Sequence, residues 1–408
     1  MIAILQLLAI LGLGYLGTHF FAERFRASFH VVTGVEFVVL GVLVGPHVTD
    51  VMTPEVLTQL GPVTSLAIGA VGLTLGLEFR FATVFRAKQE AWELSFFGVL
   101  TTALIVGGFA TAWAWMTLSP DMFLAALPAA VALGGIAAVS APEPIATVHR
   151  SMEGQVGLAR TLESSASFDE LLATLAFGLV FCFFHVGQTA GVRPLTATEW
   201  VAVSLGLGVV LGILFFLFLG RESDPDRQLL ALIGIILFSS GSAYYLNLSP
   251  LLVNLVLGAM LANTSRHSTA LRKVMGTIER PITVVILVLA GAAWKLDVMT
   301  HPIVLGLVVI VLVGRPLGKV IGGAISFRYG EPSPQLTPWM GLGTLAHGGL
   351  AIAMAVNFRQ VYTGIVADGV FSAVLVSVLV WEVLAPPRIR RALIDSEPAL
   401  APRSRVSV

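Results

Sequence analysis

Long apolar runs, separated by short polar segments, recur along the whole chain. About 20 consecutive apolar residues let a helix cross the hydrocarbon core of a membrane. The pattern therefore predicts an all-α polytopic membrane protein with about 13 transmembrane helices. The predicted spans are 2–22, 31–45, 57–77, 92–118, 121–147, 163–185, 200–220, 228–246, 248–262, 281–295, 302–327, 338–357 and 363–385.

Basic residues indicate how these spans are oriented. Lys and Arg concentrate in every second predicted loop, and cytoplasmic loops are normally the basic ones. The other loops hold only Arg193, Lys295 and Arg359. We therefore expect the N-terminus outside and the C-terminus inside. The first span lacks a charged start and a small-residue cleavage site, so we expect a retained helix.

Thirteen spans divide into six, one linker and six. Two halves of six would enter the membrane in opposite directions, as in transporters built from inverted repeats. A weak internal similarity agrees, because the VLGVL string at 39–43 in the second span parallels VLGAM at 256–260 in the ninth. We expect an inverted repeat joined by a linker helix over 200–220.

The composition excludes several classes of protein. Apolar residues make up 56% of the chain and charged residues 12%, about half the charged fraction of soluble domains. This excludes a soluble enzyme. The 24 basic residues balance the 24 acidic ones, so no basic surface for nucleic acid is expected. The single cysteine, Cys182, excludes an intrachain disulfide and a thiolate metal site.

Charged residues inside the spans are the main functional candidates. A charge near the bilayer centre costs at least about 2.5–3.5 kcal/mol, so such residues are rarely without a function. Other acids lie nearer span ends, where they can reach the interface: Glu36, Glu78, Glu163, Asp368 and Glu382. The deep charges are Glu143, Asp169, Glu170, Arg315 and Lys319.

Asp169 and Glu170 are adjacent carboxylates about two turns into the sixth span. Adjacent helix positions point about 100° apart, so one carboxylate can face a water-filled cavity while the other takes a protein partner. Two carboxylates this close disfavour being ionised at the same time. One of them can therefore hold a proton and exchange it for a cation. The alternative is a purely structural ion pair inside the helix bundle.

Glu143 lies between Pro142 and Pro144 in the fifth span. Prolines remove backbone donors, and unwound backbone at membrane depth is tolerated only where it lines a cavity or is buried in protein. We therefore expect a broken helix with a carboxylate at the break, and Ser140 as an oxygen ligand nearby. The alternative is that the prolines simply end the helix.

Arg315 and Lys319 are four residues apart in the eleventh span, so they share a helix face and need anionic partners. Glu143, Asp169 and Glu170 are the expected partners. The Gly-rich segment 341–349, which includes His347 and Gly348, occupies the equivalent place in the second half. A second helix break that crosses the first is therefore expected.

With these motifs in order, the chain resembles the monovalent cation:proton antiporter superfamily, the sodium/proton and potassium/proton exchangers. Glu143 falls on the Asp of the family's "ATDP" motif, and Pro142 on its Thr. Asp169 and Glu170 fall on the ND or DD pair, with Glu170 on its essential Asp. Further similar segments are Gly34-Val35-Glu36 through Gly45-Pro46, Gly76-Leu77-Glu78, Leu162 to Glu170, Arg315-Pro316, His347-Gly348 and Trp381-Glu382 through Pro386.

The resemblance implies a secondary active antiporter that exchanges Na+ or K+ for protons by alternating access. Cation and proton would compete for Asp169 and Glu170, helped by Glu143 and Ser140, with Arg315 and Lys319 as structural counter-charges. It implies no enzyme, no cofactor and no catalytic metal. The alternatives are an inverted-repeat symporter for another solute, such as an organic anion, and a gated cation channel.

The resemblance also implies a division of the transporter domain, 1–385. A dimerisation part would comprise 1–91 and 227–300, and an ion-transport core 92–185 and 301–385. A homodimer in the lipid bilayer of a bacterial inner (plasma) membrane is expected. The tail, 386–408, is too short for a nucleotide-binding domain.

Overall fold

The protein is helical throughout the part that the structure, a computed structural model, describes. That part comprises residues 4–12, 34–84, 86–152, 156–187, 193–219, 225–265, 268–330 and 337–395. The first predicted span is described only over 4–12, and the end of the predicted tail lies outside these ranges. Several basic residues of the predicted inner loops also lie outside them: Arg24, Arg26, Arg221, Arg266, Arg403 and Arg405.

Twelve of the thirteen predicted spans correspond to helices or broken helices, and a helix also covers 4–12 in the first. Eight candidate spans in the described residues are long and apolar enough to cross a membrane. The helices are α2 (Val35–Val44), α3 (Pro54–Gln59), α4 (Gly61–Glu78), α5 (Phe81–Val84), α6 (Gln89–Thr117), α7 (Pro120–Ala138), α8 (Pro142–Arg150), α9 (Val156–Phe183), α10 (Ala197–Leu219), α11 (Pro225–Tyr245), α12 (Pro250–Thr264), α13 (Ser268–Ala293), η1 (Asp297–Thr300), α14 (Pro302–Tyr329), η2 (Met340–Thr344), α15 (Gly348–Val361) and α16 (Ile365–Asp395).

Several helices extend beyond the predicted spans, because apolar runs mark only the part of a helix in contact with hydrocarbon. Helix α13 begins at Ser268, well before the predicted span at 281. Helix α16 continues to Asp395, beyond the end of the predicted span at 385. Ile389 and Leu393 keep this extension helical by packing into a buried cluster with Val148 of α8.

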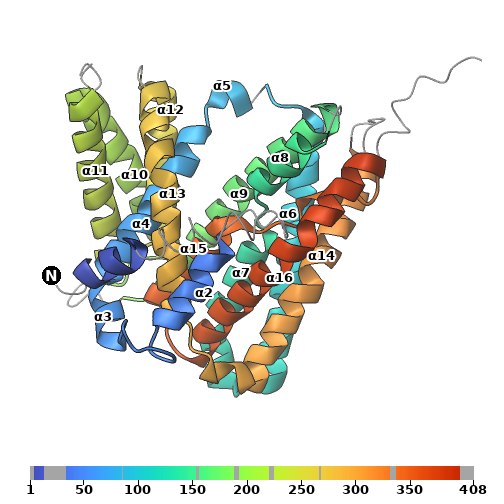
Figure 1. Ribbon diagram of the computed structural model, residues 1–408, viewed down its shortest axis with the longest axis horizontal. Coiled ribbons are helices and arrows are strands. Elements are labelled where there is room, and N and C mark those ends of the chain that lie inside the picture. Colours follow the sequence, from blue (N-terminus) through green and yellow to red (C-terminus); the bar gives the residue numbers. More distant parts are fainter. Residues whose placement is uncertain are drawn as a thin grey trace, which may run out of the picture.

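The helices pack mainly within two groups (Figure 1). In one group α14 lies along α6 and α16, and α7 and α9 pack against α6. In the other group α12 lies along α4, α13 packs on α2 and α4, and α10 and α11 cover α12. Helix α15 lies between the groups and contacts α16 on one side and α13 and α4 on the other.

Glycine pairs bring two pairs of helices into backbone contact. A Cβ added at Gly291 of α13 would lie 2.9 Å from Cα of Gly41 in α2, and one at Gly258 of α12 would lie 2.9 Å from Cα of Gly76 in α4. Only glycine permits so close an approach. Gly41 and Gly258 hold the same place in the two similar VLG strings, and each packs on a glycine of the other half. This correspondence agrees with the predicted inverted repeat.

The molecule has two ends that matter for the site (Figure 1). One end carries α5 and the outer part of α8, and we call it the α5 face. The opposite end carries α3 and the turn between α13 and α14, and we call it the α3 face. The basic-residue pattern predicts that the α5 face is cytoplasmic.

Candidate functional site

Two interrupted helices meet in the middle of the molecule. Helix α7 ends at Ala138 and α8 begins at Pro142, while η2 ends at Thr344 and α15 begins at Gly348. The two breaks bond to each other directly. Ala141 N donates to Ala346 O over 2.9 Å, and the Ser140 hydroxyl donates to Thr344 O over 2.7 Å. The two predicted helix breaks are therefore present, and they face each other.

Local sequence explains where each break lies. Pro142 occupies the first turn of α8, where its missing N–H costs nothing and its fixed φ suits a helix start. The prolines thus begin α8, and the unwound residues 139–141 precede them. Pro144 is buried inside the first turn. In the second break Gly348 has φ +71°, a left-handed conformation that favours glycine.

Gly348→Ala should be strongly destabilising. An added Cβ would lie 2.6 Å from Cβ of Ala141 across the crossing, besides the cost of about 1–2 kcal/mol for a left-handed non-glycine residue. Thermal melting of the purified protein in detergent measures the loss. Gly364→Ala is the matched control, because Gly364 has φ +98° and an added Cβ there would meet no atom within 4 Å. If the two variants melt alike, the crossing is not tightly packed at Gly348.

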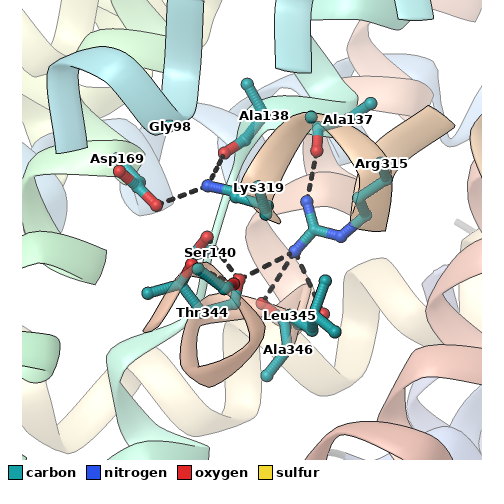
Figure 2. A network of polar contacts seen from close by, with 12 residues as sticks. Gly98, Ala137, Ala138, Ser140, Asp169, Arg315, Lys319, Thr344, Leu345 and Ala346 are labelled. Carbon is teal, nitrogen blue, oxygen red and sulfur yellow. Dashed lines mark hydrogen bonds and ion pairs between the residues drawn. The ribbon is translucent and has the colours of Figure 1, made fainter. Parts of the chain in front are cut away.

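Arg315 of α14 binds the carbonyl ends of both interrupted helices (Figure 2). Its guanidinium is fully buried and donates to Ala137 O of α7, and also to Thr344 O, Leu345 O and Ala346 O at 3.4, 3.1 and 3.2 Å. None of these hydrogen bonds goes to Glu143, Asp169 or Glu170, the acids expected as its partners. Carbonyls at a helix end lack internal partners and carry partial negative charge, so the breaks supply the anionic surroundings.

Lys319 makes an ion pair at the crossing (Figure 2). Its ammonium donates to Asp169 Oδ2 over 2.6 Å and to Ala138 O over 2.8 Å. Both side chains are buried, with exposures of 1% and 2%. Gly98 of α6 lies alongside, and a Cβ there would lie 3.8 Å from Lys319 Cδ. The predicted partnership of a deep lysine with Asp169 is confirmed.

Asp169 and Glu170 of α9 have different surroundings, as adjacent helix positions should. Asp169 points to Lys319, whereas Glu170 is partly exposed. Glu170 interacts through charge with Glu143, Glu78 and Glu279 as well as with Asp169. Glu143 itself is exposed in the first turn of α8. Carboxylates therefore lead from exposed Glu143 through Glu170 toward buried Asp169.

His347 and Ser140 are both fully buried at the crossing. His347 Nε2 lies 3.0 Å from the Ser377 hydroxyl of α16. Ser140 is engaged with the opposite break, as described above. Within the described residues no three His, Cys, Asp or Glu side chains are grouped to hold a metal ion. A bound alkali cation would therefore need backbone or hydroxyl oxygens as well as carboxylates.

Two acids near the site were not singled out from the sequence. Glu382 of α16 was expected near the interface, but it is only 2% exposed and accepts from Gly348 N at the start of α15 over 3.1 Å. Glu279 fell outside the predicted tenth span and lies within α13, facing the charges of Glu143 and Glu78. A longer helical reading of 268–293 would have placed Glu279 on the same helix as the tenth span.

The sodium/hydrogen exchanger transmembrane family matches residues 7–394, nearly the whole chain. The chain belongs to this family. The exchanger is thus a multi-pass membrane transporter for cation:proton antiport and not an enzyme. Cations, protons and membrane lipid are accordingly its partners. A search of curated proteins finds no match.

Two solved structures share the fold of the exchanger. The sodium proton antiporter MjNhaP1 from Methanocaldococcus jannaschii at pH 8 has a TM-score of 0.71 and 16% identity, over 95% of this chain and 99% of that one. An electron-microscopy structure of MjNhaP1 has a TM-score of 0.64 and 16% identity, over 97% of each chain. At this identity the likeness concerns the fold. It agrees with the predicted all-α fold class.

Proposed function

We propose that this exchanger moves Na+ or K+ against protons by alternating access, with Glu170 as the carboxylate for which cation and proton compete. The observation that supports this most is the contrast within one helix turn. Asp169 is buried on Lys319, whereas Glu170 is partly exposed among other acids. Within the part of the chain that the structure describes, Asp169 has a cationic partner in an ion pair and Glu170 has none.

The charges of Arg315 and Lys319 at the crossing are already engaged by other groups. Arg315 cannot release its proton at physiological pH, so it is a permanent counter-charge for the carbonyl ends of the breaks. Lys319 balances Asp169. Glu170 then carries the charge that changes, and a proton or an alkali cation neutralises it. Glu143 and Ser140 supply additional oxygens along the path. Asp169 becomes a ligand for the cation when its ion pair with Lys319 breaks.

Neutralisation of the Glu170 carboxylate explains how cation movement is coupled to proton movement. An ionised carboxylate without a partner is costly to carry through a low-dielectric interior, whereas a protonated or cation-loaded one is not. The core therefore crosses only when Glu170 is loaded. One loaded crossing in each direction exchanges a cation for protons, and the empty form produces no leak.

The packing supports the proposed division into two parts. We propose that 92–185 and 301–385 form a moving core, and that 1–91 and 227–300 form a dimerisation part in a homodimer, with the linker at 200–220 corresponding to α10. The two packing groups follow this division, and α15 contacts both. We propose a bacterial plasma membrane as the site of action.

Proton flux in proteoliposomes, recorded with a pH-sensitive dye, tests the proposal with Na+, K+ and Li+ added in turn. Because both ions compete for one carboxylate, the apparent KM for the cation should rise as pH falls, by about tenfold per pH unit once the carboxyl is mostly protonated. Maximal turnover should fall at high pH, where proton loading limits the cycle, so the profile is bell-shaped.

The control is the same assay with membrane potential clamped by valinomycin and K+. Cation flux without proton flux would contradict antiport and indicate a gated channel. A KM that does not change with pH would contradict competition at a shared carboxylate.

A further inference from the structure

A second ionic group lies on the α3 face, away from the crossing. Asp368 in the first turn of α16 accepts from Lys295 Nζ over 2.8 Å and from Arg359 Nε over 2.7 Å. Asp368 is 8% exposed, whereas the Lys295 side chain is half exposed. Lys295 follows α13, and Arg359 lies in the last turn of α15. The carboxylate thus joins elements of the two proposed parts of the transporter.

The end of α15 makes further polar contacts with the same opposite part. Arg359 also donates to Ala293 O at the end of α13. Gln360 accepts from Ser65 of α4 over 3.1 Å and donates to Gly61 O over 3.1 Å. One turn earlier, Asn357 accepts from Ser249 at the start of α12 over 2.6 Å. The last turn of α15 is therefore attached to α4, α12 and α13 by side chains.

A cavity of about 690 Å³ lies at this junction. Lys295, Arg359 and Asp368 line it, together with Thr64 of α4. Arg359 also lies over the Phe371 ring, 4.9 Å from its centroid, which restricts where the guanidinium can move. The cavity wall is thus made from both proposed parts and is held together by the bonds around Asp368.

We propose that Lys295, Asp368 and Arg359 form the gate that keeps the transport path shut on the α3 face. This inference rests on alternating access in the proposed function. In this proposal the exposed Glu143 marks the side from which the crossing is open in this structure, the α5 face. When the core moves, Asp368 and Arg359 leave with α16 and α15, Lys295 stays with α13, and water from the cavity enters between them.

Thiol accessibility tests the gate directly. Cys182, which is 1% exposed, is replaced by Ser, and a single reporter, Ser65→Cys, is placed beside Gln360, where exposure is also 1%. The labelling rate of the full-length protein in detergent with a water-soluble maleimide then reports opening on the α3 face. Lys295→Met should raise this rate about two- to fivefold, the range of a half-exposed ion pair, and Asp368→Asn at least about tenfold, since it loses both partners.

Two controls separate a gate from a merely loosened protein. Asp297→Asn lies in the same cavity with a 71% exposed side chain and should leave the rate unchanged. A second reporter, Glu143→Cys, is on the opposite side, and its labelling should slow when the gate variants shift the protein toward the other state. Faster labelling at both reporters, or no change at Ser65→Cys, would overturn the gate.

The outcome is separate from the fate of the proposed function, because labelling needs no ion gradient. A gate that responds as expected in a protein without cation-dependent proton flux would contradict the antiport proposal and keep the gate. Normal exchange with unchanged labelling would contradict the gate and keep the antiport proposal.

Discussion

Glu170→Gln should reduce cation-driven proton flux to the level of empty vesicles. Glutamine has nearly the same shape but cannot ionise, so neither a proton nor an alkali cation can be exchanged at this position. The protein should remain folded and should melt within about 1 kcal/mol of the parent, because Glu170 is partly exposed and loses only repulsion from neighbouring acids. Flux in proteoliposomes and melting in detergent measure the two effects.

The matched control is Glu163→Gln, the same change two turns earlier on α9. Glu163 lies 3.5 Å from His149 and is partly exposed, away from the crossing. It should keep cation-dependent flux. Full flux in Glu170→Gln would make Asp169 the better carrier, released from Lys319 during the cycle.

Arg315→Ala should cause a large loss of stability together with loss of transport. Its guanidinium binds carbonyls of both interrupted helices, and a buried polar group left without a partner costs about 1–3 kcal/mol. We expect a total loss of at least about 3 kcal/mol, comparable to removing one member of a buried pair. Thermal melting in detergent measures it.

Arg315→Lys gives a graded test, because a single ammonium keeps the charge but cannot reach as many carbonyls as a planar fork. The melting temperature of Arg315→Lys should lie between those of Arg315→Ala and the parent protein. Arg328→Ala, an exposed site near the end of the same helix, should melt like the parent. If Arg315→Ala melts like the parent too, water satisfies the breaks and the arginine does not hold them.

Much of the fold was predictable because a membrane imposes a strong length rule on apolar segments. The two interrupted helices were predictable too, because Pro142 and Pro144 are not tolerated in a helix interior and the glycines at 341–349 favour a break. Helix ends outside the hydrocarbon were not predictable. Hydropathy does not distinguish a helix that ends at the interface from one, such as α16, that continues along a neighbouring helix.

Part of the site could be predicted and part could not. That Lys319 needs a deep carboxylate follows from charge and depth, and Asp169 was one of the three acids expected. The partners of Arg315 do not follow in this way, because they are backbone carbonyls, which every residue carries and which become free acceptors only where a helix is interrupted. Glu382 was equally hidden, since its partner is the Gly348 N–H at the start of α15. The amino-acid sequence does not show which backbone N–H and carbonyl groups are left free to bind a side chain.

The glycine pairs limit what can move. Where the backbones of α2 and α13 touch at Gly41 and Gly291, and those of α4 and α12 at Gly76 and Gly258, no side chain is present to change rotamer. One helix cannot slide past the other without first lifting away from it. The boundary around Arg359, by contrast, consists of long polar side chains that can turn and find water. We therefore expect the moving core to be displaced along that boundary, while the glycine-paired helices keep their contacts and move as rigid units.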